Sequence, residues 1–582
     1  MAAELVGTTI GVVGVLGQLF DGCVKAYHYF TAARELDADG QRLLCKVRIE
    51  EMRLVVWGRE WGVAEGRLDA HLDGRRNPQL RLLATQILRE LHGTVTDFAK
   101  LKERYGLVDG GGGADDVAEA AGGGKGAAGG SPVPSRKGSK DGERARANGG
   151  SSNVSGERSW RKEFGLRAKW VIGGKPLTYL PASPPRSSAK AQGVDFNDGL
   201  ERLFPPSQLP SFQRAWTHQL LESAQRDVAQ LSLLETASTG VYPQLTASAT
   251  LKKLRINLDA RPQSAFKPTF ALKVARSALD LAPQQQQQQQ QRKDLHRCQA
   301  VHESVGPVVV EWVDYDKEDI EGRVAHVRRL DDLARMMHSA SSCHPDLHTI
   351  DCVGYTDDAA NSRYGLVYKA PAASCSTLHA LIASPDLKTP DLNDRVRLAQ
   401  TLAVALWSLH SLDWLHKSLC GNNILFFPSA FSTSAHSSTA AAALVPDISA
   451  PFLVGFDASR PDLDTALSVA PKNPSIGDLH RHPASLRGLT HCKSYDIYSL
   501  GLVLLEIGLW KVLQTYYKSH YSAERWRDKV VLPVLVPGLS SKVGRRYKEV
   551  VEMCLEASDE LTGQEAGELM EKVVTSLESI SV

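Results

Sequence analysis

The stretch from Leu406 to Phe427, LWSLHSLDWLHKSLCGNNILFF, constrains the fold more than any other part of the sequence. Leucines recur here at the spacing of a helix that buries one apolar face, at Leu402, Leu406, Leu409 and Leu412. Residues 421–423, GNN, interrupt this pattern, and the apolar run that follows is typical of a short strand. The sequence therefore predicts a helix, a tight loop and a strand in immediate succession.

The loop inside this stretch resembles the catalytic loop of protein kinases, which reads H-R-D-L-x-x-x-N. Here it reads His416, Lys417, Ser418, Leu419, Cys420, Gly421, Asn422 and Asn423. In kinases the aspartate accepts the substrate proton, and the asparagine holds magnesium. A serine cannot accept a proton at neutral pH, so the general-base contribution of about 100- to 10,000-fold is expected to be absent. We therefore expect no catalytic residue at His416, Lys417 or Ser418.

Two later segments extend the kinase resemblance. Gly455, Phe456 and Asp457 stand where kinases have Asp-Phe-Gly, so the metal carboxylate is missing unless Asp457 moves into its place. The run SYDIYSLGLVLLE at 494–506 resembles the central helix of the kinase large lobe. The resemblance assigns structural roles to Asp496, His416 and Phe456. It assigns cofactor-binding positions to Asn423 and Asp457, and we expect no metal site.

The residues before the loop resemble the small lobe of a kinase. A strand is predicted at 308–313, strands also at 349–355 and 364–370, and a helix between them. Its expected apolar face consists of Val324, Val327, Leu330, Leu333, Ala334 and Met337. Val313 stands where the phosphate-pairing lysine is expected, and no G-x-G-x-x-G loop precedes it. We expect an α+β bilobal protein-kinase-like fold that is catalytically inactive and that could bind ATP only without productive magnesium.

The N-terminal segment 5–20, LVGTTIGVVGVLGQLF, contains no charged residue. As a helix it would span ~24 Å, which is less than the ~30 Å hydrocarbon core of a bilayer. No basic region precedes it, so a secretory signal is not expected. The helical pattern continues to Ala33 and recurs at 43–55 and 80–98, which predicts a helical bundle.

Residues 1 to about 108 resemble the opening half of the HeLo domain, the helical effector module of the fungal HET-S incompatibility protein. The resemblance rests most on residues 53–63, RLVVWGREWGV, which are similar to the family segment R-L-x-x-W-G-x-x-x-G-[IV]. HeLo domains of this type are implicated in programmed cell death, in which the N-terminal helix damages the plasma membrane. The resemblance implies self-association through this domain and a membrane-active helix that includes Leu5, Ile10, Val13, Leu16 and Phe20.

Two segments of low complexity suggest the domain boundaries. Residues 109–155, rich in Gly, Ala and Ser, cannot bury enough apolar surface to offset the entropy of ordering, so a flexible insertion is expected. Residues 241–299 form the expected linker, with glutamines from Gln284 to Gln291. Its segment 251–258, LKKLRINL, fits a strand, a brace between domains or a basic patch for acidic lipid, and we favour the brace. The expected domains are an all-α HeLo bundle at 1–240 and the kinase-like domain at 300–582.

Charge and cysteine content limit the partners and the compartment. A formal charge of +2 does not indicate a nucleic-acid partner. Nine cysteines are scattered without paired metal spacing, which fits reduced thiols in a cytoplasmic protein. We expect a cytoplasmic protein that is recruited to the plasma membrane on activation.

Three functional hypotheses remain open. In the first, the kinase-like domain responds to a protein or ligand stimulus and releases the N-terminal helix to plasma membrane lipid. In the second, the protein is an active, atypical Ser/Thr kinase that binds ATP and uses Asn423 and Asp457 on one metal ion. In the third, the protein is a non-enzymatic signalling scaffold, and the glycine-rich helix is part of its core.

Overall fold

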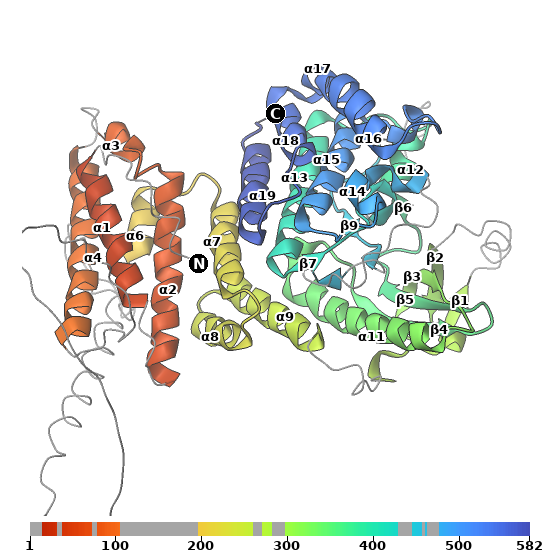
Figure 1. Ribbon diagram of the computed structural model, residues 1–582, viewed down its shortest axis with the longest axis horizontal. Helices are drawn as coiled ribbons and strands as arrows, with labels where there is room; N and C mark the ends of the chain where they lie inside the picture. Colours follow the sequence, from red (N-terminus) through yellow and green to blue (C-terminus); the bar gives the residue numbers. More distant parts are fainter. Residues whose placement is uncertain are drawn as a thin grey trace, which may run out of the picture. The chain divides into compact units, whose positions relative to one another are not determined.

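The computed structural model describes residues 14–31, 38–72, 78–104, 196–259, 270–281, 297–428, 445–456, 460–461 and 476–581. The chain divides into two compact units, Met1–Pro205 and Pro206–Val582 (Figure 1). In its described residues the first unit is helical, whereas the second combines helices with antiparallel sheets. The expectation of a multidomain protein with a helical N-terminal region is confirmed.

The N-terminal unit is a bundle built around helix α1. Its described helices are α1 (Val15–Thr31), α2 (Ala38–Glu60), α3 (Arg67–Leu72), α4 (Pro78–Arg104) and α6 (Phe196–Leu203). Helix α1 packs mainly against α4 and α2, and it buries Leu16 and Phe20, which are 0% and 8% exposed. Gly58 of α2 allows this packing, because a Cβ atom there would lie 2.1 Å from the ring of Phe20.

Helix α6 is fastened to α2 by the residues that carry the RL-x-x-WG pattern. The buried Arg53 guanidinium lies 2.9 Å from Asp198 and 2.7 Å from Glu201, both on α6. The indole nitrogens of Trp57 and Trp61 both donate to the carbonyl of Phe204, just after α6. This segment therefore holds the last described helix of the unit in place.

The C-terminal unit contains a five-stranded antiparallel sheet in the order β1-β2-β3-β5-β4. Its strands are β1 (Leu279–Leu281), β2 (Arg297–His302), β3 (Gly306–Asp314), β4 (Cys352–Asp358) and β5 (Arg363–Lys369). Helix α11 (Ile320–Cys343) connects β3 to β4 and packs against β4, as Figure 1 shows. Short 3-10 turns η2 (Phe270–Leu272) and η3 (Arg276–Ala278) precede β1, and η4 (Pro345–Leu347) follows α11.

The rest of this unit is mainly helical. Its longer helices are α13 (Leu392–Ser411), α15 (Lys493–Leu509), α18 (Arg545–Leu555) and α19 (Gly563–Glu578). The shorter helices are α12 (Leu378–Ala383), α14 (Pro483–Leu486), α16 (Ala523–Trp526) and α17 (Ser540–Val543), with a π-helical turn at Arg527–Leu535. This region also contains two small sheets. One consists of β6 (Ser376–Thr377), β8 (Ile424–Phe426) and β9 (Phe452–Leu453), and the other pairs β7 (Trp414–Leu415) with β10 (Arg460–Pro461). Helix α15 is buried along nearly its whole length.

Helices α7 (Leu209–Ala224), α8 (Val228–Ser238) and α9 (Pro243–Asp259) belong to the C-terminal unit. Helix α7 packs against α13 and α19, and α9 packs against α11. Lys252 of α9 is 0% exposed, and its ammonium donates to the carbonyls of Leu221 and Ser411. The same ammonium lies 2.9 Å from the Asp413 carboxylate, so this lysine joins α9, α7 and the end of α13.

These helices differ from the expected domain organisation. The first domain was expected to end near residue 240, with residues 200–234 closing the bundle, whereas the division falls between Pro205 and Pro206. Residues 241–299 were expected to be a linker, but they include α9, β1 and the start of β2. The segment 251–258 is helical rather than a strand. An amphipathic pattern shows that a helix buries one face, but it does not show which unit covers that face.

The expected elements of the sheet region are present with shifted ends. The strand predicted at 308–313 extends over Gly306–Asp314, and the other two lie at Cys352–Asp358 and Arg363–Lys369. The apolar face of α11 includes the predicted Leu330, Leu333, Ala334 and Met337, all buried. Val324 is an exception, because it is exposed near the start of the helix.

The buried lysine yields a stability prediction. Replacing Lys252 with Met would remove the donor shared by Leu221 and Ser411 and leave Asp413 with a poorer partner. We expect Lys252→Met to lower the free energy of unfolding by about 2–4 kcal/mol. Urea unfolding of the full chain measures this, with Lys253→Met as the matched control. Lys253 pairs with Glu235 nearer the surface, so its replacement should change stability by less than about 1 kcal/mol; equal losses would contradict the buried role of Lys252.

Candidate functional site

The loop after β7 is held by a buried carboxylate at the start of α15. Asp496 is 0% exposed, and its oxygens accept hydrogen bonds from the backbone N–H groups of His416 and Lys417, at 2.7 and 2.8 Å. The imidazoles of His410 and His491 lie 3.4 and 3.0 Å from the same carboxylate. Burial raises the pKa of Asp496, but the hydrogen bonds from His410 and His491 outweigh it, so the pKa lies well below the ordinary value.

His416 and Phe456 form the apolar side of the loop. The ring of Phe456 lies 5.0 Å from that of His416 and 5.8 Å from that of Trp414. All three side chains are buried. Burial lowers the pKa of His416, so this imidazole is neutral at physiological pH and does not act as a charged group.

Asn423 is engaged at both ends of its amide. Its Nδ2 donates to the Ser418 carbonyl at 2.7 Å and to the Ser418 hydroxyl at 3.2 Å. Its Oδ1 accepts a hydrogen bond of 2.9 Å from the guanidinium of Arg297, on β2. The amide oxygen, which the kinase resemblance assigns to magnesium, therefore already faces a cation.

Glu311, on β3, pairs with the same arginine. Its carboxylate accepts from Arg297 Nε at 2.9 Å, from the Gly455 N–H at 3.0 Å and from the Tyr368 hydroxyl at 3.0 Å. Burial disfavours the charge on Arg297, but Glu311 outweighs this and raises the pKa of the guanidinium above its ordinary value. A partly buried, hydrogen-bonded ion pair thus joins the sheet to the loop.

Gly455 leaves no space for a side chain beside Asn423. A Cβ atom at Gly455 would lie 2.4 Å from Nδ2 of Asn423, and the backbone φ of +84° is in the region that favours glycine. The amide of Asn423 therefore packs where a side chain at 455 would begin.

The residues present do not fit a magnesium–nucleotide complex. Arg297 donates to the Oδ1 atom of Asn423, the Glu311 carboxylate is already paired with Arg297, and Gly455 supplies no carboxylate. Within the described ranges, no group of three or more His, Cys, Asp or Glu side chains could hold a metal ion. A cleft of about 280 Å³ in the described chain is lined by residues of 482–559 that do not include these positions.

The structure brings together five of the residues singled out from the sequence, namely His416, Lys417, Ser418, Asn423 and Asp496. Phe456 lies beside them, and Asp457 lies outside the described residues. Sequence reasoning missed Arg297 and Glu311. A lone glutamate inside the apolar strand VVVEWV was the available signal, because a charge at such a position needs a partner. Arg297 was missed because it lay within the expected linker.

The N-terminal helix is the second candidate. Leu16 and Phe20 are buried in the bundle, whereas Leu5, Ile10 and Val13 lie outside the described residues. Among the helices that the structure describes, none is both long and apolar enough to cross a membrane.

Family comparisons match separate parts of the chain. The HeLo family model, described as prion-inhibition and propagation, matches residues 7–176. A model described as a domain of unknown function (DUF7580) matches residues 311–576. No curated protein is significantly similar to the chain. The first match supports the HeLo part of the resemblance, and it points to a function of the fungal incompatibility or cell-death type.

The buried carboxylate yields a prediction with a defined pH dependence. Asp496→Asn removes the charge that binds four donors, so we expect the free energy of unfolding to fall by about 2–4 kcal/mol at pH 7. Because the folded pKa of Asp496 is lowered, its contribution is present above the unfolded pKa of about 3.9 and is lost as pH falls below it. Urea unfolding at pH 7 and pH 3 should therefore show a smaller difference between the two proteins in acid.

The control for this experiment is Asp528→Asn, whose carboxylate is about half exposed. It should change stability by less than about 1 kcal/mol at either pH. A pH-independent loss in Asp496→Asn would contradict the ionised role of Asp496.

Proposed function

We propose that this protein is a cell-death or incompatibility effector in which a catalytically inactive, kinase-like C-terminal domain restrains a membrane-active HeLo domain. The observation that carries the proposal is the HeLo match over residues 7–176. The same proposal includes self-association through the HeLo domain, a cytoplasmic resting location, and activation by an unidentified protein or ligand.

Two features support a kinase-like C-terminal domain. The sheet order β1-β2-β3-β5-β4, with α11 between β3 and β4, agrees with a kinase small lobe. The carboxylate of Asp496 binds the loop backbone at His416 and Lys417, the role that the kinase resemblance assigns to it. Fold alone does not define function, so the activity must be argued from the site.

The site favours a regulator over an enzyme. Phosphoryl transfer depends on metal ions and cationic groups that stabilise phosphate charge. Here the cation Arg297 is bound to Glu311 and Asn423, and neither Ser418 nor Gly455 supplies a carboxylate. No observation favours the active-kinase hypothesis over this one.

The packing of α1 supports releasable membrane activity. Its apolar side chains Leu16 and Phe20 are covered by the bundle, so the resting helix does not present them to lipid. Burial of these side chains in a bilayer interface would replace the contacts that they lose, since both environments are apolar. Release of the helix is the step that the C-terminal domain would control.

Membrane activity can be tested by dye release from vesicles that contain acidic lipid. We expect residues 1–205 to release dye and the full chain to release at least about tenfold less, because the C-terminal unit restrains the bundle. Val13→Glu should abolish release by the fragment, because a charge opposes insertion. Leu82→Glu is the matched control, because Leu82 is exposed on α4, and it should retain release.

Two outcomes would contradict the membrane proposal. One is a folded 1–205 fragment that is inert toward vesicles and toward growth on overexpression. The other is a loss of helical content in Val13→Glu without a specific loss of dye release, which would favour the scaffold hypothesis.

Nucleotide chemistry can be tested on the full chain. We expect no magnesium-dependent thermal shift with ATP and no transfer of radiolabelled phosphate, because Arg297 occupies the amide oxygen that would bind the metal. Asn423→Ala should leave both readouts unchanged. Phosphate transfer that Asn423→Ala abolishes would show an active kinase and would overturn the inactive-regulator proposal.

A further inference from the structure

Helix α7 is the first helix of the C-terminal unit, and residues 204–208 join it directly to α6 of the N-terminal unit. Docking of α7 on α13 and α19 therefore determines where the chain leaves the C-terminal unit. Any release of α7 would free the segment that leads to α6. The ionisable side chains between α7 and its neighbouring helices determine how the docking of α7 depends on pH.

The packed side of α7 carries the buried His218 and, one helical turn later, the half-buried Glu222. His218 is 2% exposed, and its ring makes a perpendicular contact with Trp407 of α13 at 4.5 Å. Glu222 faces α19 at Gly567. A Cβ atom at Gly567 would lie 2.3 Å from Oε1 of Glu222, so this glycine makes room for the carboxylate.

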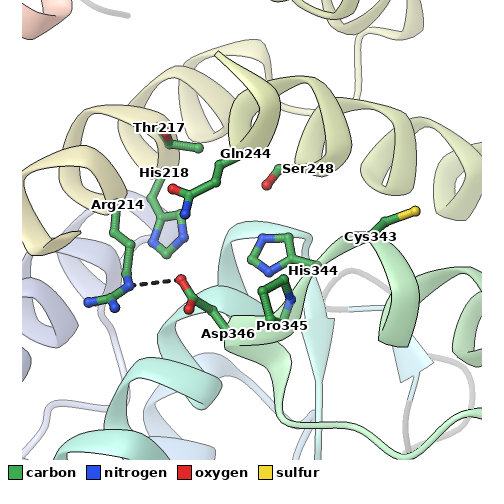
Figure 2. Close-up of a pocket in the computed structure, with 9 residues that line it drawn as sticks. All are labelled: Arg214, Thr217, His218, Gln244, Ser248, Cys343, His344, Pro345 and Asp346. Carbon is green, nitrogen blue, oxygen red and sulfur yellow. Dashed lines mark hydrogen bonds and ion pairs between the residues drawn. The ribbon is translucent and has the colours of Figure 1, made fainter.

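A small cleft of about 20 Å³ lies between α7, α9 and the end of α11. Figure 2 shows the imidazoles of His218 and His344 pointing toward one another across it. In the described chain, Thr217 Oγ1, His218 Nδ1 and Ser248 Oγ have no hydrogen-bond partner, and each belongs to a buried side chain. The cleft has room for one water molecule, which needs about 10–15 Å³, and that water could bridge these atoms.

Charged groups surround this cluster from every neighbouring element. They are Arg214 on α7, Lys252 on α9, Asp346 in η4, Asp413 after α13, Lys493 on α15, and Glu568, Glu571 and Glu578 on α19. The carboxylate nearest the cleft, Asp346, is paired with Arg214 at 2.8 Å. Asp413 is likewise paired with Lys252 at 2.9 Å. A proton on either imidazole would find no free carboxylate among these two.

The ionisation of the three groups follows from this packing. Burial, reinforced by His344 and Arg214, lowers the pKa of His218 well below its ordinary value. Burial also lowers the pKa of His344, although Asp346 opposes the shift. Burial raises the pKa of Glu222 to about 7, against the nearby Lys493 and Lys252. Docking thus favours neutral forms at all three positions.

We propose that α7 is held by a proton-compensated latch, in which docking excludes protons from His218 and His344 and favours a proton on Glu222. Glu222 opposes the acid sensitivity of the two histidines. The latch consequently stays closed near neutral pH and opens only in stronger acid. This inference does not rest on membrane activity of the N-terminal unit.

The direction of each contribution follows from linkage. Each histidine must stay neutral for α7 to dock. As the pH falls below the free imidazole pKa of about 6.5, each one therefore weakens docking by up to about tenfold per pH unit. Glu222 acts in the opposite direction, because docking gains strength as pH falls from about 7 toward the ordinary value of 4.5. Between pH 7.5 and 5.5, Glu222 strengthens docking by about 20-fold, whereas the two histidines weaken it.

Hydrogen exchange of the α7 backbone amides in the full chain tests the latch. Protection at pH 7.5 and 5.5, corrected for the intrinsic exchange rate, reports the opening equilibrium of α7. We expect Glu222→Gln, which mimics the protonated carboxyl at both pH values, to lose about 20-fold more protection between these two pH values than the natural protein does. The double variant His218→Gln, His344→Gln should show the opposite sign, with stronger protection at pH 5.5.

His520→Gln is the matched control, because His520 is exposed and distant from α7 in the sequence, and its response should equal that of the natural protein. An unchanged pH response in Glu222→Gln would overturn the proposal. A double histidine variant that still loses protection in acid would also overturn it. If the double variant does not fold, Glu222→Gln alone tests the proposal. An equal loss of protection at both pH values in this variant would show that Glu222 has a packing role only, and it would overturn the proposal.

Discussion

The carboxylate of Asp496 is the interaction on which the arrangement of the candidate site depends. It lies at the start of the buried helix α15 and binds the backbone N–H groups of His416 and Lys417. A buried, ionised carboxylate is costly unless its oxygens are hydrogen-bonded, and here four donors satisfy it. The loop that follows is thereby fixed to the core of the unit, which in turn positions Asn423.

From Asn423 the same chain of contacts reaches the sheet. Its amide oxygen binds Arg297 on β2, and Arg297 pairs with Glu311 on β3. Glu311 also accepts the N–H of Gly455, so strand and loop are joined through one carboxylate. Groups that could have contacted a phosphate or a metal are paired with one another. This pairing fixes the positions of these side chains relative to one another.

The helices α7–α9 show how a connecting segment can become part of a domain. Their burial depends on side chains of α11, α13 and α19, and Lys252 satisfies backbone carbonyls from both α7 and α13. The C-terminal unit therefore begins with helices that follow α6 after only a short connection. The segment that Arg53, Trp57 and Trp61 hold is thus followed directly by α7 in the chain.

Local patterns in the sequence were sufficient to predict the helical N-terminal region, the strands near 308–313 and 364–370, and the loop at His416. Each depends on spacing between neighbours, which a sequence displays directly. Asn423 and Asp496 were also identified, because they stand at fixed positions in short motifs. Arg297 and Glu311 were not, since they lie on different strands and acquire their role only by meeting at the loop.

The sequence by itself thus determined the helical character of the N-terminal region, the strands and the helix of 306–369, and which motif positions lack a carboxylate. Tertiary structure alone decided that α7–α9 join the C-terminal unit and that Arg297 binds Asn423. It also decided that Gly567 makes room for Glu222. The physical reason is that an apolar face or a charged side chain specifies the need for a partner, whereas the identity of that partner depends on contacts between residues far apart in the chain.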